Sequence, residues 1–145
     1  MLMHAPWAGP DAVRGARVLD AFAGTGALGL EALSRGALHA TFIERDRAAL
    51  AALRVNAAAA GAAAEVLSAD TLRPPPGRPC GLVFLDPPYG QDLVPRALAA
   101  LRDAGWVAPD ALIVAEVGRD DPSPAPGDAL AARAHGAARI EIWRA

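Results

Sequence analysis

The sequence contains no lysine and only one cysteine, and aromatic residues make up 5% of its 145 positions. The single cysteine, Cys80, excludes a disulfide framework and any zinc site built from several cysteines. No apolar run reaches the ~18 residues that a transmembrane helix needs. The first residues also lack the basic stretch, followed by an apolar one, that marks a signal peptide. We therefore expect a cytoplasmic protein with no membrane partner.

An excess of positive charge is also missing. The 14 arginines face 16 acidic residues, and the net charge of −2 differs from the strongly basic balance of a self-sufficient nucleic-acid binder. The three histidines are scattered and show no metal-ligand spacing, so we expect no metal. Apolar residues make up 53% of the chain, and 37 residues are alanine. This composition and length favour one soluble domain over residues 1–145, which we expect to be a monomer.

Short apolar runs alternate with helical stretches along the chain. Buried strands are predicted at residues 17–22, 40–44, 65–67, 82–86 and 111–117, and helices at 27–35, 46–60 and 92–104. This alternation is typical of an α/β fold in which right-handed crossovers build a mostly parallel sheet. The proline-rich stretch 74–79 predicts a short or absent helix in one crossover. Residues 130–134 and 139–143 predict a C-terminal antiparallel hairpin.

A glycine-rich turn follows the first predicted strand. Residues 24–29 (GTGALG) fit the pattern G-x-G-x-x-G and open a predicted helix. Glycines there let backbone N–H groups approach a ligand beside the positive end of the helix. Twenty positions after Gly24, Glu44 ends the second strand, where a carboxylate can accept hydrogen bonds from both ribose hydroxyls. We interpret the pair as a nucleoside site, and the alternative is a tight turn beside a solvated glutamate.

Two aspartates indicate which kind of nucleoside would bind. Asp20 lies at the strand end, four residues before Gly24. In dinucleotide-binding folds, by contrast, the strand leads directly into the glycine turn. A carboxylate there suits the ammonium or sulfonium group of S-adenosylmethionine and would repel a pyrophosphate. Asp70 follows the third strand at the same sheet edge and could accept a hydrogen bond from an adenine amino group. Either aspartate could instead cap a helix or a turn.

The strongest signal is Asp86-Pro87-Pro88-Tyr89, at the end of the fourth strand. Two consecutive prolines remove two backbone N–H groups and stiffen the turn, which leaves carbonyl oxygens free to face a ligand. The Asp86 carboxylate and the Pro87 carbonyl could each accept one hydrogen of a planar amino group on an aromatic base. Tyr89 could stack on the face of the same ring. The alternative is a stiff turn whose aspartate only caps a helix.

With these motifs the chain resembles the class I S-adenosylmethionine-dependent methyltransferases that act on exocyclic amines. Residues 28–37 (LGLEALSRGA), 42–46 (FIERD) and 105–107 (GWV) make it similar to the RsmD-type 16S rRNA guanine-N2 methyltransferases. The resemblance extends from about residue 18 to residue 117. It implies a Rossmann-like, seven-stranded, mostly parallel sheet with a C-terminal antiparallel hairpin. It also implies S-adenosyl-L-methionine as methyl donor and guanine N2 as acceptor, in 16S rRNA or a small ribosomal subunit assembly particle.

The resemblance further implies roles for individual residues. It assigns the acceptor amine to Asp86, Pro87, Pro88 and Tyr89, and the cofactor to Asp20, Phe22, Gly24, Thr25, Gly26, Glu44, Arg45 and Asp70. Members of the family carry a basic upstream segment that contacts RNA and covers part of the cofactor. Here the motif strand begins at residue 17. We therefore expect this chain to lack that segment and to methylate rRNA poorly by itself.

Other functions stay open at this point. Related enzymes methylate adenine N6 or a glutamine amide, usually with asparagine in the position of Asp86. A nucleotide-dependent oxidoreductase would leave the turn at residues 86–89 without a role. A non-catalytic S-adenosylmethionine-binding module would result if the upstream segment were essential. Glu116, at the end of the fifth strand, is interpreted only as a cap of that strand.

Overall fold

The computed structural model describes residues 12–88 and 93–145. The strands in this part of the chain are β1 (Arg17–Asp20), β2 (His39–Glu44), β3 (Ala64–Ser68), β4 (Cys80–Leu85), β5 (Val107–Gly118), β6 (Ala131–His135) and β7 (Ala138–Arg144). The helices are α1 (Ala27–Ser34), α2 (Arg47–Ala57), α3 (Leu93–Asp103) and the short 3-10 helix η3 (Ala58–Ala63). Every strand and helix predicted from the sequence is present, with bounds that differ by a few residues.

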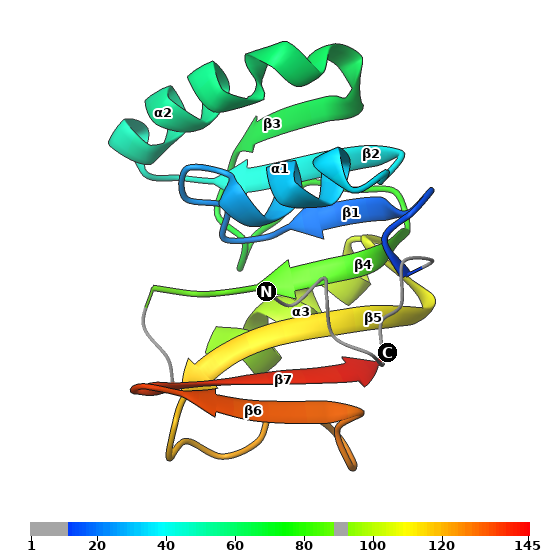
Figure 1. Cartoon of the computed structure of the whole chain (residues 1–145), viewed down its shortest axis with the longest axis vertical. Coiled ribbons are helices and arrows are strands. Elements are labelled where there is room, and N and C mark those ends of the chain that lie inside the picture. Colours follow the sequence, from blue (N-terminus) through cyan, green and yellow to red (C-terminus); the bar gives the residue numbers. More distant parts are fainter. Residues whose placement is uncertain (1–11, 89–92) are drawn as a thin grey trace.

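The strands form one sheet in the order β3-β2-β1-β4-β5-β7-β6 (Figure 1). Strands β1 to β5 run parallel, and β7 is antiparallel to both of its neighbours, β5 and β6. The predicted seven-stranded, mostly parallel sheet with a C-terminal antiparallel hairpin is therefore confirmed. Since β1 lies between β2 and β4, the order of the strands reverses beside β1. Open α/β sheets bind ligands outside the carboxyl ends of their strands at such a reversal.

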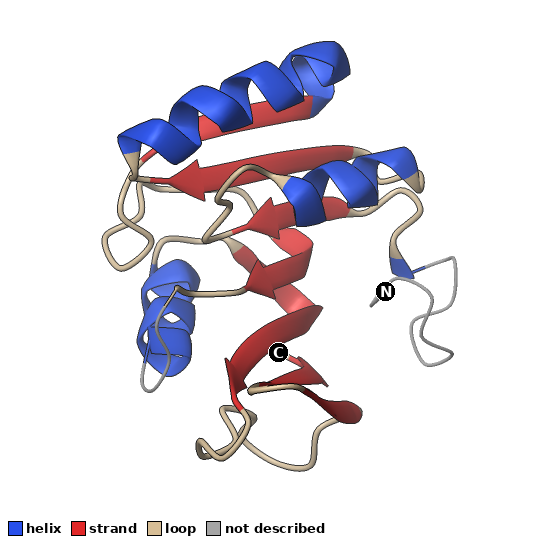
Figure 2. Ribbon diagram, turned by 60° about the vertical axis from the view of Figure 1, so that its left-hand side comes forward, coloured by secondary structure: helices blue, strands red, loops and turns tan. Residues whose placement is uncertain are grey.

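Helices cover both faces of the sheet. Alternate side chains of a strand point to opposite faces, so Val18 and Phe84 pack on the side of α1 and α2, while Leu19 and Leu85 pack on the side of α3 (Figure 2). Because both faces of the sheet are buried at its centre, the inner strand β4 is a nearly continuous apolar run instead of an alternating one. No helix in the described ranges is long and apolar enough to cross a membrane.

Local sequence signals explain where several elements begin and end. Asp46 caps α2 by accepting a hydrogen bond from the Ala49 N–H at 2.9 Å. The helix predicted to continue to residue 60 ends earlier and passes into η3, in which Gly61 takes a φ of +58°. Residues 69–79 connect β3 to β4 without a helix. That connection is held by the Trp106 indole, whose N–H donates to the Pro75 carbonyl at 2.7 Å.

Gly29 allows α1 to lie close to the sheet, and Gly29→Ala should destabilise the fold. A Cβ at this position would lie 2.4 Å from the ring of Phe42, which is fully buried in β2. Forcing an extra methyl group into such a core costs roughly 1–3 kcal/mol. Gly81→Ala is the matched control, because nothing lies within 4 Å of a Cβ there. The urea midpoint of unfolding should be lower for Gly29→Ala than for the wild type and unchanged for Gly81→Ala. Equal midpoints for the two variants would contradict the close packing of α1 against Phe42.

Candidate active site

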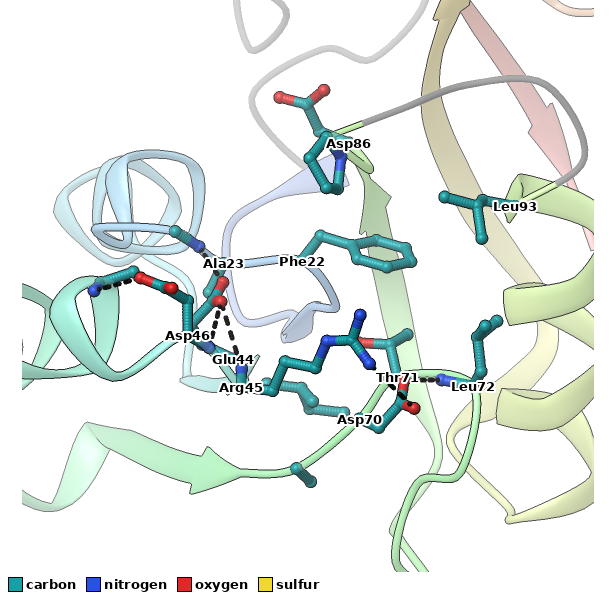
Figure 3. A pocket seen from close by; sticks show the side chains of 15 residues that line it. Phe22, Ala23, Glu44, Arg45, Asp46, Asp70, Thr71, Leu72, Asp86 and Leu93 are labelled. Carbon is teal, nitrogen blue, oxygen red and sulfur yellow. Dashed lines mark hydrogen bonds and ion pairs between the residues drawn. The ribbon is translucent and has the colours of Figure 1, made fainter.

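A pocket of about 530 Å³ opens where β1, β2, β3 and β4 end (Figure 3). Its volume lies within the range of roughly 300–1,000 Å³ that is usual for small-molecule sites. The predicted site residues that line it are Phe22, Gly24, Glu44, Arg45, Asp70, Asp86 and Pro88. The pocket thus brings together residues from four separate strand ends, as expected at the carboxyl edge of a parallel sheet.

Glu44 connects three parts of the pocket wall through backbone hydrogen bonds. Its Oε1 accepts from the Gly24 N–H at 2.7 Å. Its Oε2 accepts from the Arg45 N–H at 3.1 Å and from the Asp46 N–H at 2.9 Å (Figure 3). These contacts join the end of β2 to the glycine turn after β1 and to the start of α2. The Glu44 carboxylate therefore shapes the pocket in addition to lining it.

Arg45 and Asp70 form an ion pair within the pocket. The Arg45 guanidinium lies 3.3 Å from Asp70 Oδ2, and Asp70 Oδ1 accepts from the Leu72 N–H at 2.9 Å. The Thr71 hydroxyl donates to the Ala21 carbonyl and ties this loop to the end of β1. The Arg45 side chain is 75% exposed, and exposed ion pairs contribute at most about 1 kcal/mol. A ligand group can therefore replace Arg45 at Asp70 at small cost.

Asp20 lies behind the pocket and is not part of its lining. Its side chain is 2% exposed, and Oδ2 accepts a hydrogen bond from the Gly29 N–H at 3.0 Å. Because Gly26, the residue before α1, has no side chain, the Asp20 carboxylate caps this helix from the neighbouring strand. Burial raises the pKa of Asp20 to about 7; the Gly29 hydrogen bond opposes this shift, and the charge of Glu44 adds to it.

Asp20→Asn should stabilise the free protein at alkaline pH. An asparagine oxygen can accept the Gly29 N–H without a charge to desolvate. Since the pKa of Asp20 is 3.8 unfolded and about 7 folded, the wild-type protein should lose stability as the pH rises through this window, and no further above it. The total is on the order of 4 kcal/mol by linkage. Urea unfolding at about pH 5 and about pH 8 checks this. If the free energy of unfolding falls equally in the wild type and in Asp20→Asn between the two pH values, Asp20 does not have the raised pKa given above.

Asp86 follows β4 and stands at the opposite end of the pocket from Asp70 (Figure 3). Its carboxyl group keeps an exposed face and points away from Phe22. The pKa of Asp86 is raised to about 7, first by partial burial, then by a hydrogen bond with the Glu116 side chain, and after these by the negative charges of Glu116 and Asp20. Two carboxyl groups therefore share this end of the sheet.

The other residues predicted for the site belong to the turn after β4 and to the glycine turn after β1. Pro88 lines the pocket, whereas Pro87 is buried beside it. Thr25 is exposed, and its carbonyl accepts from the Asn56 side chain at 3.0 Å. Gly26 is buried with a φ of +94°, which only glycine adopts easily. Tyr89 lies outside the described residues.

Several lining residues were not predicted as site residues: Ala23, Ile43, Asp46, Ala49, Ala69, Thr71, Leu72 and Leu93. Most follow or end a predicted strand, and that position was the available signal, because all parallel strands end at the same edge. Asp46 both lines the pocket and caps α2. In the part of the chain that the structure describes, no three histidine, cysteine or acidic residues are placed to hold a metal ion.

Comparisons with known proteins identify the family. The family described as Conserved hypothetical protein 95 matches residues 4–144. Ribosomal RNA small subunit methyltransferase D of Escherichia coli strain K12 is 44% identical over 113 residues, which are 76% of this chain and 57% of that relative. This chain thus spans little more than half the length of that curated relative.

Solved structures share the fold. The yhhF protein of Escherichia coli superimposes with a TM-score of 0.85 at 36% identity, over 99% of this chain and 81% of that one. An RNA methyltransferase from Salinibacter ruber, solved with S-adenosyl-L-homocysteine, has the same fold at 15% identity, with a TM-score of 0.72 over 97% and 92% of the two chains. The chain belongs to the Conserved hypothetical protein 95 family, that of the RsmD-type methyltransferases which its motifs predicted.

Proposed function

We propose that this protein transfers a methyl group from S-adenosylmethionine to the exocyclic N2 amine of a guanine in 16S rRNA. The observation that carries the proposal is the turn at residues 86–88, where Asp86 and Pro88 line the same pocket as Glu44 and Asp70. The pocket thus combines acceptors for an amino group with acceptors for a nucleoside. The name of the Escherichia coli relative, a small subunit rRNA methyltransferase, supports the same reaction.

The charge of the pocket supports a cationic nucleoside as the cofactor. Glu44, Asp46, Asp70 and Asp86 contribute four carboxyl groups to the lining, against one cationic side chain, that of Arg45, among the described lining residues. Such a pocket repels the pyrophosphate of a dinucleotide and attracts sulfonium and ammonium groups. The sheet also departs from the all-parallel order 3-2-1-4-5-6 of dinucleotide-binding folds, because β7 lies antiparallel between β5 and β6.

The residues at the ends of β1, β2 and β3 each suit a different part of S-adenosylmethionine. Glu44 would accept hydrogen bonds from the ribose hydroxyls, and Asp70 from the adenine amino group once Arg45 moves aside. Phe22 gives an apolar surface between Asp86 and the Arg45–Asp70 pair (Figure 3). Gly24 shapes the turn with Thr25 and Gly26, and the carboxyl group of Asp20 is buried behind it. The bound cofactor supplies a methyl group on a positively charged sulfur, which a nucleophile can displace.

The turn after β4 would prepare the acceptor amine. An aromatic amine is a weak nucleophile, because its lone pair is delocalised into the ring. When Asp86 and the Pro87 carbonyl accept both amino hydrogens, they favour a pyramidal nitrogen with a localised lone pair. The nitrogen would gain a bond to the methyl carbon while the bond from that carbon to sulfur breaks, and it would then release one proton to solvent. Orientation and preorganised acceptors therefore suffice without a separate general base. The guanine must leave its stack to reach the turn, and Tyr89 would stack on its ring.

The proposed substrate is 16S rRNA, free or within a small-subunit assembly particle. We propose that one domain acts on it as a monomer in the cytoplasm. Calorimetry with S-adenosylmethionine and with NAD tests the cofactor, and we expect binding of the first only. Methyl transfer to small-subunit particles, followed by mass spectrometry of the nucleosides, should give N2-methylguanosine. No transfer even in a single turnover with the protein in excess over the particles, or methylation of adenine N6, would contradict the proposal.

A further inference from the structure

Thr71 is a buried threonine in the pocket wall, and its hydroxyl group joins two strand ends. The residue is 4% exposed and follows Asp70 in the connection after β3 (Figure 3). Its hydroxyl donates a hydrogen bond to the carbonyl of Ala21, which comes directly after β1 and is fully buried. Burying a hydroxyl group is unfavourable unless it is hydrogen-bonded, and valine would fill the same space without that cost. The polar group therefore points to a role for the hydrogen bond itself.

This hydrogen bond completes the attachment of a tight turn that carries Asp70. The Arg73 N–H donates to the Asp70 carbonyl at 2.9 Å and closes the turn. The Ala69 N–H donates to the Glu44 carbonyl at 3.1 Å and ties the start of the turn to the end of β2. The Thr71 hydroxyl ties the middle of the turn to the end of β1. The turn is thus attached to two neighbouring strands at the edge of the pocket.

The two carboxylate oxygens of Asp70 have different surroundings. Oδ1 accepts from the Leu72 N–H at 2.9 Å, within the turn. Oδ2 lies 3.3 Å from the exposed guanidinium of Arg45, which a ligand group can replace. Because Oδ1 is bound to the backbone of the turn, the position of the turn sets the direction of Oδ2. Any shift of the turn therefore moves the acceptor that is proposed for the adenine amino group.

We propose that Thr71 is a positioning residue, whose hydrogen bond to Ala21 holds the turn so that Asp70 Oδ2 meets the adenine amino group of S-adenosylmethionine. This inference rests on the proposed function, which supplies the cofactor. Thr71 acts on the amino group through Asp70. Because Ala21 directly precedes Phe22, the same hydrogen bond fixes the separation between Asp70 and the apolar surface of the pocket.

Two variants separate the hydroxyl group of Thr71 from its bulk. Thr71→Val keeps the shape but removes the donor to the Ala21 carbonyl, so the Kd for S-adenosylmethionine should rise about tenfold. Thr71→Ser keeps the donor, and its Kd should stay within about threefold of the wild type. Thr41→Val is the matched control, because Thr41 is a buried threonine of β2 that does not line the pocket. It should leave the Kd unchanged in titration calorimetry.

Three further measurements distinguish positioning from a general loosening of the pocket. In an Asp70→Ala background, Thr71→Val should change the Kd by less than about twofold, since the group that it positions is absent. Calorimetry with S-adenosylhomocysteine and with its inosine counterpart, which has a carbonyl oxygen in place of the amino group, measures recognition of the amine. Thr71→Val should weaken binding of the adenosine form about fivefold more than binding of the inosine form. At saturating cofactor, the kcat of Thr71→Val should equal that of the wild type within about twofold.

Amide hydrogen exchange in the free protein tests the turn without any ligand. The Leu72 N–H should exchange at least about tenfold faster in Thr71→Val than in the wild type or in Thr71→Ser. If Thr71→Val does not fold, Thr71→Ala, which also lacks the hydroxyl, takes its place in every measurement.

The outcomes separate this inference from the proposed function. If the wild type binds the cofactor but methylates no RNA, the proposed function fails, while the Kd values and the exchange rates still decide the role of Thr71. An equal Kd in the wild type and in Thr71→Val overturns the inference. An unchanged Leu72 exchange rate does so too, as does an equal effect of Thr71→Val with and without Asp70. No cofactor binding by the wild type overturns both.

Discussion

Asp86→Ala should remove nearly all methyl transfer while S-adenosylmethionine binds almost as before. Asp86 stands at the end of the pocket opposite Asp70 and is proposed to face the acceptor amine, not the adenosine (Figure 3). Losing one preorganised acceptor typically costs on the order of 10²–10³ in rate. Single-turnover transfer to small-subunit particles measures the rate, and calorimetry measures the affinity for the cofactor.

Two further variants control for the Asp86 result. Asp103→Ala removes an exposed aspartate at the end of α3 and should leave turnover unchanged. Asp86→Asn keeps the size of the side chain and one acceptor oxygen but cannot pair with Glu116 in the same way, so its rate should lie between the wild type and Asp86→Ala. Wild-type turnover in Asp86→Ala would remove Asp86 from the proposed mechanism.

Glu44→Ala should do the opposite and weaken cofactor binding first. The variant loses the proposed charge-assisted hydrogen bonds to ribose, which together contribute roughly 2–4 kcal/mol, or about 30- to 1,000-fold in Kd. It also releases the N–H groups of Gly24 and Asp46, so the wall of the pocket loses its preorganisation. Titration calorimetry with S-adenosylmethionine measures the effect, and transfer at saturating cofactor should be reduced much less than binding.

The control for Glu44 comes from the neighbouring strand. Glu65→Ala removes an exposed glutamate of β3 that pairs in register with Thr41, away from the pocket edge. It should leave the Kd unchanged. Glu44→Gln retains an amide oxygen that can accept one of the backbone N–H groups, so its loss should be intermediate. An affinity for Glu44→Ala within twofold of the wild type would show that Glu44 only holds the backbone.

The order of elements and the pocket edge were accessible from the sequence. Alternating strands and helices imply parallel strands, and parallel strands bring Glu44, Asp70 and Asp86 to one edge whatever the register. The glycine turn and the consecutive prolines gave these positions a chemical meaning, because each constrains the backbone in a way that few other residues do. These features depend on local sequence and on the handedness of the crossovers.

Contacts between residues far apart in the chain could not be predicted from the sequence in this way. Asp20 was expected to face a ligand, but the placement of α1 over β1 directs its carboxylate to the Gly29 N–H. Glu116 was interpreted as a strand cap, and only the register between β4 and β5 places it beside Asp86. Register depends on the packing of whole strands, which no short motif encodes.

The position of β1 in the middle of the sheet has a consequence for how the chain folds. Val18 pairs with Ala40 on one side and with Leu82 on the other, so the second pairing must close a much longer loop than the first. We therefore expect β1, β2 and β3 to associate before β4 joins them. The Asp86 end of the pocket is then absent from early folding intermediates. A ligand that needs the complete pocket should accordingly slow unfolding and leave the refolding rate nearly unchanged.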